Sequence, residues 1–110
     1  MPYYLWTANY TREAVQAMVK QPQDREAAAR KAIEAVGGKL HHAFIALGPT
    51  DVVVLAEFPD DTTAAAVTLA VGAAGTITNA ATTKLLTFAE FAEAMRKAGT
   101  IAMAYGPPQG

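Results

Sequence analysis

Residues 39–58 read KLHHAFIALGPTDVVVLAEF and form the most informative segment of the chain. Strand-forming residues occupy 39–47 and 52–58, and the Gly-Pro-Thr-Asp segment between them is typical of a turn, so the spacing predicts a β-hairpin. Both runs are apolar at nearly every position rather than at every second one, which indicates a sheet that is covered on both faces. We expect a second copy of the chain to cover one of them.

An aromatic strand is predicted before the hairpin, at residues 3–10. Its even-numbered positions share one face and carry three aromatic side chains and one small one: Tyr4, Trp6, Ala8 and Tyr10. Aromatic walls with polar tips suit a small apolar pocket, but core packing and subunit interfaces use the same residues. Both alternatives stay open at this point.

Two helical segments are predicted between this strand and the hairpin. Thr11 can cap the first, Pro22 interrupts it, and the helical pattern resumes from about Gln23 until Gly37 and Gly38 end it. The apolar stripe of the second segment consists of Ala29, Ile33 and Val36. Its charged positions are predicted to form a solvated face and are Arg25, Glu26, Arg30, Lys31 and Glu34.

A helix, a strand and a final helix are predicted after the hairpin. Asp60 and Asp61 begin the first helix, whose body at 62–71 is apolar all round, so it either packs on both sides or is simply alanine-rich. Residues 76–86 predict a threonine-rich fourth strand. Thr87 and Glu90 have the spacing of a capping box that opens the final helix.

The final helix is predicted to turn an apolar stripe inward and to end at Gly99. The stripe consists of Phe88, Phe91, Ala92 and Met95. Beyond the helix, Ile101, Met103 and Tyr105 alternate as in a short strand. Such a tail could add an edge strand to a neighbouring subunit or pack on its own sheet.

This order of elements predicts an α+β fold, a ferredoxin-like split β-α-β-β-α-β sandwich with an extra C-terminal helix and tail. We expect one domain over residues 1–110, with a core at 1–98 and a tail at 99–110. Both crossover helices of this arrangement lie on one side of the sheet. The other side needs a cover, and we expect a homodimer or a higher homo-oligomer.

The composition excludes several classes of function. The net charge of −1 offers no basic field for nucleic acid or for an anionic membrane. Cysteine and serine are both absent, which removes disulfides, thiolate metal sites and the serine nucleophile. Because the chain lacks cysteine and opens directly into a strand-like run without a basic leader, we expect a cytoplasmic protein.

The chain resembles the GYD-domain family over nearly its whole length. The likeness is carried by Tyr4-Leu5, Tyr10-Thr11, Arg30-Lys31-Ala32, Gly37-Gly38-Lys39, Phe44, Gly48, Asp51, Pro59-Asp60, Leu69-Ala70-Val71, Gly75, Leu85-Leu86-Thr87 and Tyr105-Gly106-Pro107-Pro108. The namesake tyrosine is replaced, because Pro49 and Thr50 stand between Gly48 and Asp51. The resemblance implies a dimeric α+β barrel and no particular reaction, although related barrels include monooxygenases, isomerases and stress-response proteins.

The candidate catalytic residues are His41, His42 and Glu57. Imidazole can transfer protons near neutral pH, and a half-buried carboxylate in an apolar strand can do the same at a raised pKa. Adjacent residues on a strand point to opposite faces, so the two histidines cannot share one metal ion without a bulge, and we expect no metal site. For each of these three residues, the alternative to a role in proton transfer is a side chain that simply points into solvent.

Six residues are candidates for contact with a ligand: Tyr4, Trp6, Asn9, Phe44, Asp51 and Lys84. Asp51 has a structural alternative, because an aspartate at a turn commonly accepts backbone hydrogen bonds. The leading hypothesis is a homo-oligomeric module that binds a small apolar or aromatic metabolite between sheet and helices, with no cofactor. The alternatives are a cofactor-independent enzyme of the dimeric-barrel type, acting by proton transfer or oxygenation, and a purely structural assembly unit.

Overall fold

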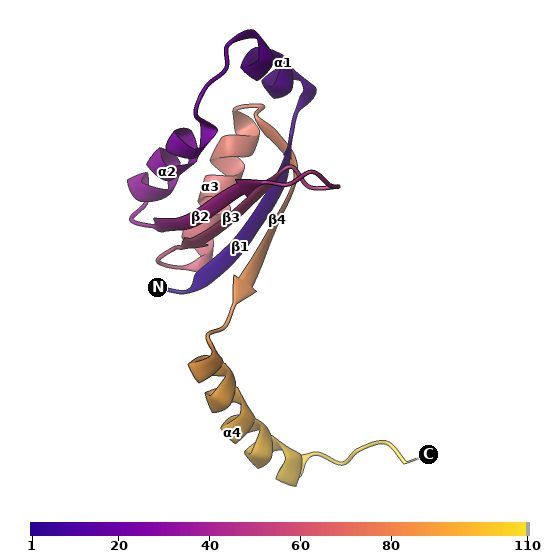
Figure 1. The fold of residues 1–110 in the computed structure, drawn as a ribbon. Coiled ribbons are helices and arrows are strands. Elements are labelled where there is room, and N and C mark those ends of the chain that lie inside the picture. Colours follow the sequence, from indigo (N-terminus) through magenta and orange to yellow (C-terminus); the bar gives the residue numbers. More distant parts are fainter. Residues whose placement is uncertain (110) are drawn as a thin grey trace.

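The computed structural model describes residues 1–109, which form four strands and four helices (Figure 1). In chain order these are β1 (Tyr3–Tyr10), α1 (Arg12–Lys20), α2 (Arg25–Ala35), β2 (Lys39–Ile45), β3 (Val52–Glu57), α3 (Asp61–Ala73), β4 (Ile77–Leu85) and α4 (Phe88–Ala104). The strands form an antiparallel sheet in the order β2-β3-β1-β4. The α+β class is thereby confirmed, and this strand order is compatible with the predicted ferredoxin-like arrangement.

The hydrophobic core lies between the sheet and helices α2 and α3. Tyr4 of β1 is only 2% exposed, and its ring meets Phe58 edge-on at a centroid distance of 5.5 Å. Ile33 of α2 and Ala64 of α3 pack into the same cluster as these rings. Burial of a side chain such as that of Phe58 contributes about 1.5–3 kcal/mol, so these contacts hold both helices on one side of the sheet.

The two glycines after α2 set the close approach of this helix to the sheet. Gly37 has a φ of 78°, which a side chain would strain. At Gly38 an added Cβ atom would lie 2.7 Å from the carbonyl oxygen of Glu57. The chain can therefore turn from α2 directly into β2 only with glycine at these positions.

The opposite side of the sheet, which we call the open face, carries few charges. It presents Leu5, Thr7, His42, Phe44, Val53 and Leu55, which follow from the pairing of β1 and β2 with β3. Phe44 is 68% exposed, and the other apolar members are partly exposed. Two charged residues, Lys39 and Glu57, lie opposite each other in the register of β2 and β3 at one end of the hairpin.

Helix α3 packs on one side only within this chain. Ala64 is buried against the sheet, whereas Leu69 is 72% exposed on the outer side. The alternative of burial on both sides therefore does not hold within a single subunit. Much of the outer side of α3 consists of alanine, whose small side chain can be exposed to water at little cost. Leu69 is the largest apolar side chain on that side.

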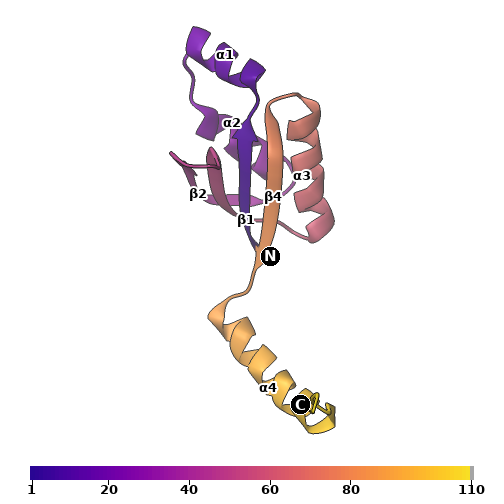
Figure 2. The ribbon, with the colours of Figure 1, turned by 90° about the vertical axis from the view of Figure 1, so that its right-hand side faces the viewer.

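Helix α4 projects beyond the sheet instead of packing on it (Figures 1 and 2). The predicted inward stripe is therefore wrong for the single chain: Phe88 is 90% exposed, and Phe91 and Met95 are also exposed. The capping box is confirmed, because the Thr87 hydroxyl accepts from the Glu90 amide at 3.1 Å and the Glu90 carboxylate accepts from the Thr87 amide at 2.9 Å. The projecting helix accounts for a longest dimension of 61 Å.

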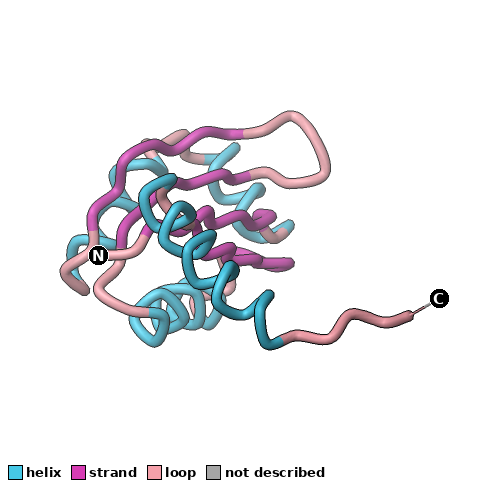
Figure 3. Tube along the Cα trace, turned by 90° about the horizontal axis from the view of Figure 1, so that it is seen from below, coloured by secondary structure: helices cyan, strands magenta, loops and turns pink. Residues whose placement is uncertain are grey.

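The prediction that Gly99 ends the final helix is also wrong, because α4 continues to Ala104. A glycine inside a helix costs about 1 kcal/mol, which the strong helix formers on either side offset here. Ile101 and Met103 consequently lie in the helix and not in an alternating strand. The chain leaves the helix at Tyr105, ahead of Pro107, and leads away from the sheet (Figure 3).

Strand β4 contains a bulge opposite Ala8. Thr7 pairs with Ala81 and Asn9 pairs with Thr78, so two residues of β4 face one residue of β1. One of them, Asn79, has a φ of 53°, a conformation that asparagine tolerates better than most residues. The bulge interrupts the regular hydrogen-bonded ladder near the start of this edge strand.

Candidate functional site

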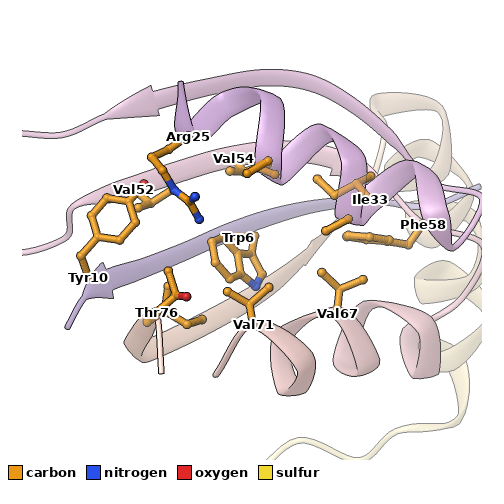
Figure 4. A pocket seen from close by; sticks show the side chains of 14 residues that line it. Trp6, Tyr10, Arg25, Ile33, Val52, Val54, Phe58, Val67, Val71 and Thr76 are labelled. Carbon is orange, nitrogen blue, oxygen red and sulfur yellow. The ribbon is translucent and has the colours of Figure 1, made fainter. Parts of the chain in front are cut away.

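A cavity of about 100 Å³ lies between the sheet and helices α2 and α3 (Figure 4). Its walls come from five elements and the segments next to them. They comprise Trp6, Tyr10, Arg25, Ala28, Ala29, Ala32, Ile33, Val52, Val54, Phe58, Val67, Val71, Thr76 and Ile77. Most of these side chains are apolar, as in sites that bind small molecules.

Small side chains on α2 leave this space open. Ala28, Ala29 and Ala32 face the sheet at positions where a leucine or a methionine would reach across the gap. On the other side, α3 contributes Val67 and Val71, whose short branched side chains also stop before the centre. The alanine-rich sequence of α2 is thus the local cause of the cavity.

Trp6 forms the floor of the cavity and is held in place by hydrogen bonds. Its indole Nε1 donates to the Thr68 hydroxyl at 2.9 Å, and that hydroxyl donates to the Ala64 carbonyl at 3.2 Å. The indole plane is therefore tied to α3. Trp6 is also the chain's single tryptophan, so its fluorescence reports on this cavity alone.

Arg25 is the charged group of the cavity. Its guanidinium points inward between Tyr10 and Trp6 (Figure 4), and its one hydrogen bond in residues 1–109 joins Nη1 to the Gln23 side-chain oxygen at 3.0 Å. No ion pair in this part of the chain includes Arg25. The predicted solvated face of α2 is therefore wrong at Arg25, which is half-buried at the rim of the cavity.

The sequence did contain a signal for this position. Arg25 lies four residues before Ala29 and eight before Ile33, so it continues the apolar stripe of α2 by one turn toward the N-terminus. Asp24 caps this helix by accepting from the amides of Glu26 and Ala27. The cap sets the helix start at Arg25, two residues later than predicted, and with it the direction of the Arg25 side chain.

The six predicted ligand contacts do not converge on one place. Trp6 lines the cavity, and Phe44 lines an open groove beside β2 that adjoins the cavity at Tyr10 and Arg25. Asn9 and Asp51 serve the turn between β2 and β3: the Asn9 amide donates to the Pro49 carbonyl at 2.9 Å, and the Asp51 carboxylate accepts from the Tyr10 amide at 3.0 Å. These two contacts hold the turn against the end of β1.

Tyr4 and Lys84, the remaining two, meet at Asp61 in a shallow hollow between α3 and β4. The Tyr4 hydroxyl donates to Asp61 Oδ1 at 2.5 Å, and Lys84 Nζ lies 3.1 Å from the same oxygen. Burial, and next the hydrogen bond to Asp61, raise the pKa of Tyr4 to about 12. The hydrogen bonds from Tyr4 and Lys84 lower the pKa of Asp61, so this cluster ties β1 and β4 to the start of α3.

The candidate catalytic residues lie on the open face, away from the cavity. His41 Nε2 is 2.9 Å from Glu57 Oε2, with side chains 24% and 17% exposed, and the ring of Tyr3 lies 5.4 Å from that of His41. His42 stacks on Phe44 at 6.3 Å. The expectation that the two histidines point to opposite faces is wrong, because a register shift between Leu40 and His42 turns both toward this face.

Residues 1–109 contain no ready set of metal ligands. No group of three histidine, aspartate or glutamate side chains lies close enough together there to hold an ion. In the same part of the chain no helix is long and apolar enough to cross a membrane. The chemistry available in the cavity is therefore that of aromatic faces, hydroxyl groups and one guanidinium.

Fold and cavity together define a small α+β protein with a mostly apolar cavity of about 100 Å³ between sheet and helices. The family model of the GYD domain matches residues 4–95, so the chain belongs to the GYD-domain family. Neither the curated proteins nor the solved structures contain a significant match.

Proposed function

We propose that the protein is a homo-oligomeric module, a dimer of the α+β barrel type in its simplest form, that binds a small apolar or aromatic molecule between sheet and helices. The observation that carries the binding proposal is the cavity lined by Trp6, Ile33 and Val67. A void of this kind costs stability in a protein without a ligand, because its walls lose packing contacts. Its occupation by a ligand would restore them.

Assembly is supported by two apolar surfaces that the single chain leaves in water. One is the open face, which includes Leu55, and the other is the apolar side of α4 with Phe88, Phe91 and Met95. Contiguous apolar patches of this kind mark interaction sites in soluble proteins. Two sheets that pack face to face lie about 10 Å apart, and a second copy would cover the open face in this way.

Light scattering coupled to size-exclusion chromatography tests the assembly. We expect a mass of at least twice 11.6 kDa at micromolar concentration. Leu55→Lys should shift the protein toward the monomer, because it places a charge in the centre of the open face. Leu69→Lys is the matched control, since Leu69 is exposed on the outer side of α3. A wild-type monomer would contradict the proposed assembly.

Binding is tested by titration of small aromatic molecules against the fluorescence of Trp6. We expect single-ring compounds to change the emission and to raise Tm, because a ligand that binds only the folded state stabilises it. Trp6→Phe should lose the optical signal, which checks that the change in emission comes from the cavity. If a library of single-ring compounds changes neither quantity, the binding proposal is contradicted.

A second candidate function is acid–base catalysis, which the contact between His41 and Glu57 favours. A carboxylate that holds one ring nitrogen of a histidine orients the imidazole for proton transfer at the other. Because this pair lies on the open face, a second copy would have to enclose the reacting molecule. Deuterium uptake from D₂O by a small aromatic molecule that binds on the open face, lost in His41→Ala and Glu57→Gln, would support catalysis; binding there without exchange would contradict it.

A further inference from the structure

We infer that the ligand of the cavity carries a carboxylate group, which Arg25 binds, on a single aromatic ring or an apolar group of similar size. This inference rests on the proposed binding function and names its ligand class. Arg25 is its central residue because it brings a permanent positive charge to walls that are otherwise uncharged.

The acids next to Arg25 already have partners. The Asp24 carboxylate accepts from the amides of Glu26 and Ala27 at 3.0 and 3.2 Å. The Glu26 carboxylate lies 3.8 Å from Arg30, one turn farther along α2. In residues 1–109 the guanidinium of Arg25 makes its one hydrogen bond to the neutral side chain of Gln23. Its remaining N–H donors are thus available to an anion.

The cavity has a polar end and an apolar end (Figure 4). Arg25 lies at the same end as the Tyr10 ring and the Thr76 hydroxyl, whereas Phe58 and Val67 line the other end. A ligand with one anionic end and one apolar end matches this division. A guanidinium binds a carboxylate through two parallel hydrogen bonds, which fixes the orientation of the ligand as well as its charge.

Size limits the apolar part of the ligand. The cavity volume of about 100 Å³ is close to that of engineered apolar cavities of about 150 Å³ that bind benzene. One six-membered ring against Trp6 fills such a space, and a fused pair of rings exceeds it. The ligand class is therefore an arylcarboxylate with one ring or a branched aliphatic acid of equal bulk, for which benzoate is the simplest probe.

The test compares benzoate with benzyl alcohol, a neutral molecule of nearly the same shape, by calorimetric titration and by Trp6 fluorescence. We expect benzoate to bind roughly 10-fold to 100-fold more tightly, the usual gain from a hydrogen-bonded charge pair. Acetate and inorganic phosphate should not bind at the same concentrations, because they lack the ring. Arg25→Gln should abolish the preference for benzoate over benzyl alcohol.

Two further variants keep the test informative. Arg25→Lys retains the charge without the paired donors, and we expect a smaller preference for benzoate. Lys31→Gln removes a positive charge from an exposed position of the same helix and should change nothing. Thermal denaturation of each variant checks that it is folded.

The outcomes separate the inference from the proposed function. Equal affinity for benzoate and benzyl alcohol in the wild type would overturn the role of Arg25 and leave the binding proposal intact. Equal loss of both ligands in Arg25→Gln would give Arg25 a structural role and also overturn the inference. If neither compound binds, and benzene itself does not, the binding proposal and the inference fall together.

Discussion

Replacement of Ala32 by leucine would fill the cavity from the side of α2. The new side chain adds three carbon atoms at a half-buried position whose neighbours include Ile33 and Val54. At about 0.8 kcal/mol for each buried carbon group the gain is about 2.4 kcal/mol, from which about 0.5–1 kcal/mol is lost with side-chain rotamer freedom. Leucine and alanine are both strong helix formers, so the net stabilisation is about 1.5 kcal/mol.

Urea denaturation followed by Trp6 fluorescence measures this change. With a denaturant slope of about 2 kcal/mol per molar, the midpoint should rise by about 0.7 M while the slope stays constant. Ligand binding should be lost, because the added side chain occupies the place of the ring. Ala35→Leu, at an exposed position of the same helix, is the control and should shift stability by less than about 0.5 kcal/mol.

The refuting result is a lower midpoint for Ala32→Leu. A closely packed site without a void responds to added methylene groups with a loss of about 1–3 kcal/mol. Such a loss would mean that the space between α2 and the sheet is closed in solution. The binding proposal would then lack its site, whatever the behaviour of Arg25.

Three other substitutions follow from the described contacts. Gly38→Ala should cost at least about 2 kcal/mol in chemical denaturation, because its Cβ atom would meet the Glu57 carbonyl oxygen at 2.7 Å. Thr87→Ala should weaken the start of α4 by about 1 kcal/mol, seen as faster hydrogen exchange of the first amides of that helix. The pKa of Asp61 is lowered in the fold, so its contribution to stability is present above about pH 4 and is lost as the pH falls further. Asp61→Asn should therefore make stability depend less on pH in the acid range. An unchanged dependence would contradict the role of Tyr4 and Lys84.

The order of strands and helices could be predicted from the sequence because local signals agreed with one another. The turn at Gly48 to Asp51 separates two strand-forming runs, and Thr87 with Glu90 marks a helix start that the structure reproduces. The end of α4 could not be predicted in the same way. Gly99 is a stop signal in isolation, but the helix formers on both sides outweigh it.

The candidate site was harder to predict because it depends on two local irregularities. Asp24 fixes where α2 begins and so sends Arg25 into the cavity, which a pattern of charged residues does not reveal. The register shift after Leu40 turns His41 toward Glu57, although simple alternation would separate the two histidines. Trp6 was predictable, because the even positions of β1 alternate regularly toward the helices.

The bulge in β4 bears on how this sheet avoids uncontrolled growth. An outer strand offers unpaired amide and carbonyl groups to any extended peptide that approaches it. At Asn79 and Ala80 the regular spacing of these amide and carbonyl groups is interrupted, and Lys84 adds a charge farther along the same strand. A foreign strand could dock on only part of β4 before its hydrogen bonds lost register. The bulge thus disfavours fibril-like addition of strands along the β4 edge. Ordered association of subunits would instead use the open face.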